Sequence, residues 1–108
     1  MCTLNVKCFE NDSNKTHVEI LRSKIGVCRV CGYEYANFFP WGESGCDPSH
    51  AICQCCNVEF GYEDSSLSAI RSYRKEWISK GAHWSNKEKK PNDWSLDSSL
   101  ANIPKVFI

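Results

Sequence analysis

Four of the eight cysteines stand in two pairs whose spacing is typical of metal ligands. The ligands that this spacing predicts are Cys28, Cys31, Cys53 and Cys56. Two thiolates separated by two residues can bind one ion from a tight turn, and two such turns complete a tetrahedral zinc site. Gly32 and Asn57 directly follow the pairs, and both residue types tolerate the left-handed backbone that a sharp turn requires. The sequence therefore predicts one bound Zn²⁺ ion.

The remaining cysteines and one histidine leave alternatives for this ligand set. Cys55 lies inside the second pair, whose spacing favours the two outer cysteines and leaves Cys55 as a buried or idle thiol. Cys46 and His50 lie close enough in the sequence to replace one ligand. We interpret Cys2 and Cys8 as ordinary small apolar residues.

The chemistry available to such an ion is limited by its ligands. Four thiolates close the coordination sphere, so the metal has no open position at which to activate water. The three histidines are scattered, and the sequence has no G-x-S-x-G, H-E-x-x-H or glycine-rich phosphate motif. We therefore expect a structural metal on which folding depends, in a protein that is not an enzyme.

The elements that position the cysteines follow from the apolar pattern. Alternating apolar residues predict an N-terminal β-hairpin, with strands near 4–8 and 18–22 joined by a turn at 11–15. Short strands are expected around the loop 32–52, and a strand and turn are expected at 58–62.

Helical spacing of apolar residues from Leu67 to Ile78 predicts a main helix over about 66–80. Ser65 or Ser66 can cap its start, and Gly81 follows its end. A short C-terminal helix is expected, with Asp97 as its cap and Pro104 as its end. The residues of this helix expected to face inward are Leu100, Ala101 and Ile103.

Length and composition fit one domain, because 108 residues with 42% hydrophobic content can bury one modest core. We divide the single domain 1–108 into an N-terminal hairpin addition (1–25), the zinc knuckles (26–64) and a helical part (65–108). The predicted fold class is α+β: a small zinc-ribbon-like antiparallel β domain with one main helix packed on it and a short C-terminal helix. The chain lacks a signal-like N-terminus and a run of about 18 apolar residues, so we expect a cytoplasmic protein.

Charge is unevenly distributed along a chain whose net charge is zero. The segment 32–65 contains acidic residues without lysine or arginine: Glu34, Glu43, Asp47, Glu59, Glu63 and Asp64. The segment 66–90 contains mostly basic charges: Arg71, Arg74, Lys75, Lys80, Lys87, Lys89 and Lys90. The two segments either neutralise each other or meet a charged partner.

Aromatic residues accompany both charged segments. Phe38, Phe39 and Trp41 lie among the acids, where exposed rings with a charged rim are typical anchors for a protein partner; alternatively, they pack on the zinc site. We predict that Trp41 and the six acidic residues contact a partner. The basic segment also contains tryptophans, which favours single-stranded nucleic acid as an alternative ligand, although a pI of about 6.8 argues against it.

Three stretches also carry a resemblance to known proteins. They are Cys28-x-x-Cys31-Gly32-Tyr33, then Ile52-Cys53-x-x-Cys56-x-x-Glu59-Phe60-Gly61-Tyr62-x-Asp64, then Arg74-x-x-Trp77-Ile78-x-x-Gly81-Ala82-x-Trp84. Together they resemble a group of small, mostly uncharacterised bacterial zinc-ribbon-like proteins; Cys55, and Asn57 in place of glycine, depart from its usual second pair. Such orphan proteins resemble immunity proteins of bacterial toxin systems, including contact-dependent growth inhibition. The resemblance implies a protein that binds and neutralises a cognate toxin, with a nuclease as the expected target. The alternative is a zinc-ribbon nucleic-acid-binding or transcription-regulatory protein.

Overall fold

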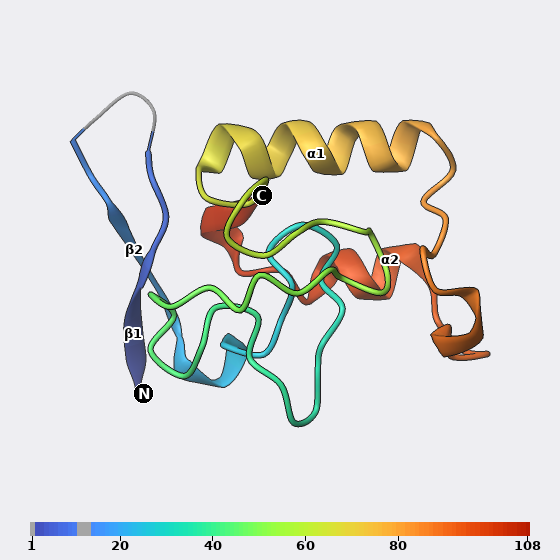
Figure 1. Cartoon of the computed structure of the whole chain (residues 1–108), viewed down its shortest axis with the longest axis horizontal. Helices are drawn as coiled ribbons and strands as arrows, with labels where there is room; N and C mark the ends of the chain where they lie inside the picture. The colour runs from blue at the N-terminus through green and yellow to red at the C-terminus, as the bar shows by residue number, and fades with distance from the viewer. Residues whose placement is uncertain (1, 11–13) are drawn as a thin grey trace.

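The computed structural model describes residues 2–10 and 14–108. Its elements, in chain order, are β1 (Thr3–Lys7), β2 (His17–Leu21), the 3₁₀ turn η1 (Arg22–Lys24), α1 (Leu67–Ser79), η2 (Lys87–Lys89), α2 (Leu96–Ala101) and η3 (Lys105–Phe107). The hairpin lies at one end of the molecule and η2 at the other, while α1 runs along one side (Figure 1). A two-stranded antiparallel sheet, one main helix and a short C-terminal helix confirm the predicted α+β class.

The hairpin forms because alternate side chains on both strands are apolar. Val6 pairs with Val18 and Leu4 with Ile20, so these side chains share one face of the ribbon. That face is turned toward the core and the other is exposed. The predicted hairpin is confirmed, but most of the turn predicted at 11–15 lies outside the described residues.

The hairpin is joined to the start of α1 immediately after β1. Phe9 forms an isolated parallel bridge with Ser66, and the Leu67 amide donates to the Phe9 carbonyl over 2.9 Å. Cys8 is fully buried at this junction, whereas Cys2 is exposed. The interpretation of these two cysteines as small apolar residues therefore suits Cys8 alone.

Between η1 and α1 the chain forms isolated bridges rather than strands. The short strands predicted around 32–52 and at 58–62 are wrong in this respect. Each cysteine pair is followed at once by a reversal of the chain, so only single residues pair before the backbone turns away.

The main helix matches its prediction closely. Ser66 is its N-cap, and the Ser66 hydroxyl oxygen accepts a hydrogen bond from the Ala69 amide over 3.2 Å. Gly81 follows the C-cap with φ of 105°, a left-handed conformation that ends the helix. The buried residues of α1 are Leu67, Ile70, Arg74 and Trp77. Ile78, predicted to lie on the same stripe, is 36% exposed.

The short helix α2 is capped by Ser95, whose hydroxyl oxygen accepts a hydrogen bond from the Ser98 amide over 3.2 Å. The prediction of Asp97 as the cap is wrong, because Asp97 lies in the first turn, where its charge still favours the helix dipole.

The inward face of α2 also differs from the prediction. Ser99 and Ile103 are buried, Leu100 is partly buried and Ala101 is exposed. Ser99 faces inward, and Ala101, two residues further along the helix, therefore lies on the opposite side; Ile103 is buried beyond the end of α2.

One continuous core surrounds the cysteines. Valines from the hairpin and from both cysteine loops pack there with Phe60, Ile70, Trp77 and Trp84. No helix in the described part of the chain is long and apolar enough to cross a membrane.

Candidate metal centre

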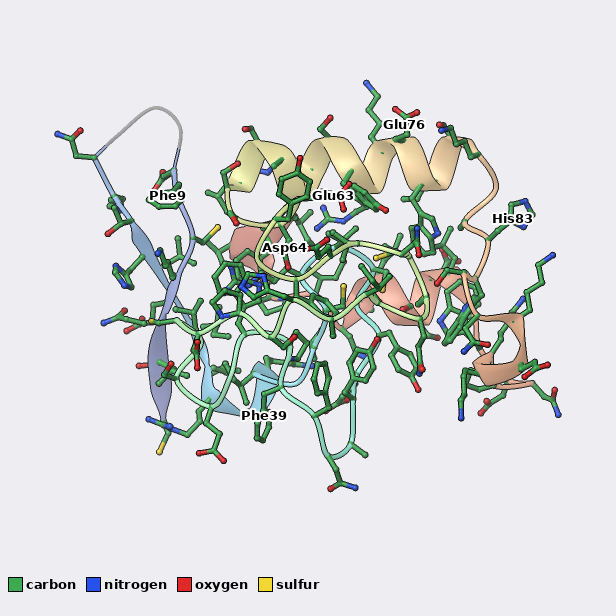
Figure 2. The ribbon with its side chains drawn as sticks, in the orientation of Figure 1. Phe9, Phe39, Glu63, Asp64, Glu76 and His83 are labelled. Atoms are coloured by element: carbon green, nitrogen blue, oxygen red, sulfur yellow. The ribbon has the colours of Figure 1, made fainter. Side chains whose placement is uncertain are left out.

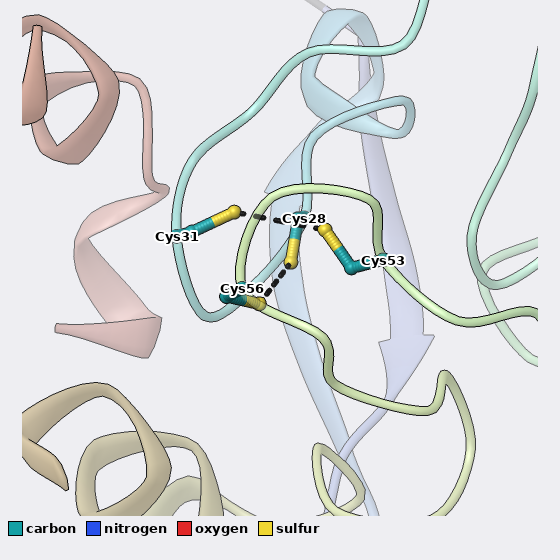
Figure 3. Close-up of side chains that lie close together, drawn as sticks. All are labelled: Cys28, Cys31, Cys53 and Cys56. Carbon is teal, nitrogen blue, oxygen red and sulfur yellow. Dashed lines mark hydrogen bonds between the residues drawn. The ribbon is translucent and has the colours of Figure 1, made fainter. Parts of the chain in front are cut away.

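The structure brings the sulfurs of Cys28, Cys31, Cys53 and Cys56 together in the buried centre of the fold (Figure 3). All four Sγ atoms lie within 4.8 Å of one another. The Sγ atoms of Cys28 and Cys56 are 3.8 Å apart, as are those of Cys31 and Cys53. Two sulfurs at ~2.3 Å from one ion, at the tetrahedral angle, are separated by about 3.8 Å. The arrangement is therefore compatible with one zinc ion bound by four thiolates.

Each cysteine pair is shaped by a small hydrogen-bonded turn, here called a knuckle. In the first knuckle the Cys28 amide donates to the Tyr33 carbonyl over 2.9 Å, and the Gly32 amide donates to the Cys28 carbonyl over 3.0 Å. Gly32 has φ of 84°, which reverses the chain directly after Cys31.

The second knuckle repeats this pattern twenty-five positions later in the sequence. The Cys53 amide donates to the Val58 carbonyl over 2.8 Å, and the Asn57 amide donates to the Cys53 carbonyl over 2.9 Å. Asn57 has φ of 71°, which confirms the left-handed turn predicted there. The two halves of the site are thus structural copies of each other.

This repeat explains the extra cysteine. Cys55 occupies the position that Val30 occupies in the first knuckle, and both side chains are fully buried. Cys55 is therefore a buried thiol in an apolar position. This agrees with the prediction that the outer cysteines form the pair and leave Cys55 as a buried thiol. Cys46 and His50 are exposed and lie outside the four-sulfur cluster found among the described residues, so neither replaces a ligand.

Burial and the contacts among the sulfurs shift the pKa values of the four thiols. Burial raises the pKa of Cys28, Cys31 and Cys56 well above the ordinary value. Hydrogen bonds from the other three sulfurs, that of Cys28 foremost, lower the pKa of Cys53. A divalent cation at the centre must therefore displace protons from buried thiols before it can bind.

Tyr35 supports the site from outside the ligand set. Its hydroxyl donates to the Cys53 sulfur over 3.3 Å and accepts a hydrogen bond from the Gln54 amide over 3.2 Å. Burial and the neighbouring Cys53 sulfur raise the pKa of Tyr35, so the hydroxyl keeps its proton and remains a donor. Such donors orient a thiolate ligand and stabilise its charge.

Arg74 of α1 holds the first knuckle through its carbonyl groups. Its guanidinium donates to the Val30 carbonyl over 2.7 Å, to the Arg29 carbonyl over 2.9 Å and to the Phe107 carbonyl over 2.7 Å. The main helix, the first knuckle and the C-terminus therefore meet at one buried cation. The sequence carried a signal for this role, because Arg74 interrupts an otherwise apolar helical stripe.

The helix α2 and a second residue of α1 also contact the backbone of the knuckles. The Ser99 hydroxyl of α2 donates to the Cys31 carbonyl over 2.7 Å, and a Cβ atom on Gly32 would lie 1.8 Å from the Ser99 carbonyl oxygen. Tyr73 of α1 donates to the Cys56 carbonyl over 3.1 Å. Both helices thus dock on the backbone that carries the cysteines.

Comparison with known proteins places the chain in a family. The chain is 33% identical over 85 residues, 65% of its own length and 70% of the relative's, to the uncharacterized protein YozI of Bacillus subtilis (strain 168). The chain belongs to the YozI family. The uncharacterized protein YoaQ of the same organism is 31% identical over 72 residues, and the chain spans 61% of its length. No family model matches the chain, and no solved structure does.

Two residues predicted to contact a partner lie in the interior of this YozI-family fold. Trp41 is 4% exposed, and its indole nitrogen donates to the Asp64 carboxylate over 2.9 Å. Asp64 is fully buried and also accepts a hydrogen bond from the Gly61 amide over 2.7 Å (Figure 2). The Arg29 guanidinium lies 4.0 Å from the centroid of the Trp41 ring. Neither Trp41 nor Asp64 presents surface to a partner, and this corrects the predicted interface.

The other predicted acids lie in three places. Glu34 lies beside Asp93 near the start of α2, and Glu43 and Asp47 are exposed on the turn that follows Trp41. Glu59 and Glu63 are half-buried and come directly after the second knuckle.

Two exposed and two half-buried side chains flank the second knuckle and are here called the second-knuckle patch: Ile52 and Tyr62, with Glu59 and Glu63. The Glu59 amide donates to the Glu63 carboxylate over 3.2 Å, and Ile52 and Glu59 are bridge partners. Ile52 is 53% exposed and Tyr62 is 73% exposed. The sequence analysis missed Tyr62 and Ile52 as candidate anchors.

Proposed function

We propose that this chain is a non-enzymatic, zinc-stabilised protein-binding module, a bacterial immunity protein that binds and neutralises a cognate toxin nuclease. The observation that carries the proposal is the second-knuckle patch, where an exposed aromatic and an exposed aliphatic side chain stand beside two carboxylates. Interfaces are commonly anchored by an aromatic residue with a charged rim.

The backbone beneath this patch supports the proposal. The patch begins next to Cys53, and the hydrogen bonds of the second knuckle fix its backbone. A surface held rigid before binding loses little conformational entropy when a partner docks. The zinc ion would thus serve binding by keeping the patch in shape.

Charge supports a basic partner. Glu59 and Glu63 lie side by side in a segment that contains no lysine or arginine between residues 32 and 65. A toxin nuclease that binds nucleic acid carries a basic surface, and opposite charge accelerates association and favours the correct partner.

The test takes as its candidate partner any basic toxin nuclease domain that is found encoded beside the gene of a YozI-family member. Isothermal titration calorimetry at two salt concentrations should show tight binding that weakens with salt, and nuclease activity should fall in proportion to complex formed. We expect Tyr62→Ala to weaken binding by about 2 kcal/mol. Charge reversal of Glu59 and Glu63 should reduce the association rate most strongly at low salt.

Charge reversal of Glu43 and Asp47 is the matched control, because these acids are exposed on a different turn. If this reversal removes binding while Tyr62→Ala does not, the interface lies on that turn instead. If the wild-type chain neither binds nor inhibits such a nuclease, the immunity function is wrong.

The alternative of a nucleic-acid-binding protein is favoured by one observation. The 3₁₀ turn η2 exposes Lys87 and Lys89, Lys90 follows directly, and the Lys90 ammonium lies 5.4 Å from the centroid of the Trp94 ring. Binding of generic single-stranded DNA or RNA in the micromolar range, with a steep salt dependence, would favour this alternative.

A further inference from the structure

A second feature of the fold lies away from the second-knuckle patch, at the loop that leaves α1. A cavity of about 450 Å³ opens there between residues 81–84 and the start of α2. His83, beyond the end of α1 (Figure 2), is one of the residues that line it. The side chains that matter for the cavity are Ala82, Trp84, Lys87, Lys90, Trp94 and Leu96. Its volume lies within the range of small-molecule sites, about 300–1,000 Å³.

Two tryptophans of this cavity have indole nitrogens without an acceptor. Among the described residues, the buried Nε1 atoms of Trp84 and Trp94 are the side-chain polar atoms that lack a hydrogen-bond partner. The other two tryptophans of the chain are satisfied: Trp41 donates to a carboxylate over 2.9 Å and Trp77 donates to the His83 carbonyl over 3.0 Å. Buried donors are almost always paired in native proteins, so two unpaired donors beside one cavity indicate a missing acceptor.

The charge around the cavity favours a negative acceptor. Lys87 of η2 and Lys90, which follows η2, line it, and none of the described residues that line it is acidic. The Lys90 ammonium is held 5.4 Å from the centroid of the Trp94 ring, which places the positive charge beside one of the two unpaired donors. The rest of the wall contains the imidazole of His83 and the apolar side chains of Ala82 and Leu96.

We propose that this cavity binds a small molecule in which an oxyanion is attached to an apolar or aromatic body. The oxyanion accepts hydrogen bonds from the Trp84 and Trp94 indole nitrogens and pairs with Lys87 and Lys90, and the apolar body packs against the tryptophan rings. Trp84 is only 4% exposed, whereas Trp94 is partly exposed, so Trp94 is the ring that moves to admit the ligand. Indole and ammonium donors serve a carboxylate and a phosphate ester equally, so the shared chemistry is the oxyanion.

The experiment is a titration of the zinc-loaded, ¹⁵N-labelled chain with phenylacetate, phenyl phosphate and neutral phenylacetamide. The four indole N–H resonances, assigned by single Trp→Phe variants, report each tryptophan separately. We expect an oxyanion ligand to shift the Trp84 and Trp94 signals and to leave those of Trp41 and Trp77 in place. Whichever of phenylacetate and phenyl phosphate binds more tightly shows whether the site prefers a carboxylate or a phosphate ester.

The variants separate a built site from general attraction of anions. Lys87→Ala combined with Lys90→Ala should weaken binding by about tenfold. Each lysine is also replaced singly, and Lys89→Ala is the matched control for Lys87→Ala, because it removes one positive charge from the same turn at a position that does not line the cavity; it should change affinity by less than about twofold. Equal loss in both variants, equal shifts with phenylacetamide, or no shift with either acid at millimolar concentration would overturn the proposal.

Discussion

At the scale of single residues, the site depends on how four buried sulfurs are kept charged and oriented. Tyr35 is the side chain outside the ligand set whose hydrogen bond reaches a sulfur, that of Cys53, over 3.3 Å. Its hydroxyl is itself fixed by the Gln54 amide, so the donor points at the sulfur before any ion arrives. A neutral donor in this position stabilises a thiolate more than a thiol.

Removal of that donor should weaken metal binding without changing the ligand set. We expect Tyr35→Phe to lower zinc affinity by about 10–100-fold, as measured by competition with a chromogenic chelator. Tyr33→Phe is the control, because its ring packs edge-on against Tyr35 at 4.8 Å between centroids and the change leaves the bond to Cys53 in place. Equal affinities for the two variants would show that the Tyr35 hydroxyl does not act on the site.

The raised pKa values of the buried thiols predict that zinc affinity depends on pH. Burial raises the pKa of Cys28, Cys31 and Cys56, so these groups carry protons at neutral pH without the ion and lose them when it binds. Lower pH therefore favours the protonated thiols and releases the metal. Apparent zinc affinity should fall by at least about tenfold for each pH unit of acidification, and calorimetry in buffers of different ionisation enthalpy should detect proton release. An affinity that does not change between neutral and mildly acidic pH would contradict this view.

At the scale of elements, the two knuckles are copies that differ in how closely other elements approach them. Gly32 of the first knuckle faces α2, where an added Cβ would lie 1.8 Å from the Ser99 carbonyl oxygen. Asn57, its counterpart in the second knuckle, is exposed. The same left-handed turn is therefore packed in one copy and free in the other.

This difference predicts unequal effects of the same substitution. Gly32→Ala should lower the free energy of unfolding by about 3 kcal/mol or more, because it combines a strained backbone with a clash against backbone atoms. Asn57→Ala should cost about 1 kcal/mol, and Asn57→Gly should leave stability unchanged or slightly higher. Thermal unfolding of the zinc-loaded variants measures both; equal losses for the two alanine variants would show that α2 does not pack on Gly32 as described.

The success of sequence reasoning depends on whether a feature is local. The cysteine spacing, the hairpin and the cap of α1 at Ser66 are recorded in adjacent residues, and each was predictable. The burial of Trp41 and Asp64 was not, because their hydrogen bond joins positions 23 apart and satisfies the carboxylate inside the core. The local acidic composition therefore pointed to a surface that those two residues do not form.

At the scale of the whole molecule, the proposed zinc ion would stand between the two knuckles on which α1 and α2 dock. Arg74 ties α1 and the C-terminus to the first knuckle, and Ser99 ties α2 to it. The part of the chain between η1 and α1 has no regular strand or helix among its described residues, so its shape depends on the knuckles. A structural zinc site contributes about 10–16 kcal/mol, comparable with the stability of an entire domain.

The most direct test is zinc K-edge X-ray absorption on the purified chain, together with its metal content by mass spectrometry. We expect one zinc per chain with four sulfur neighbours at ~2.3 Å, and Cys31→Ser should lose both the metal and the cooperative thermal transition. Cys55→Ser tests the same environment without removing a ligand and should keep the four-sulfur signal. A chain that is well folded without stoichiometric metal, or an ion with nitrogen or oxygen among its neighbours, would contradict the account.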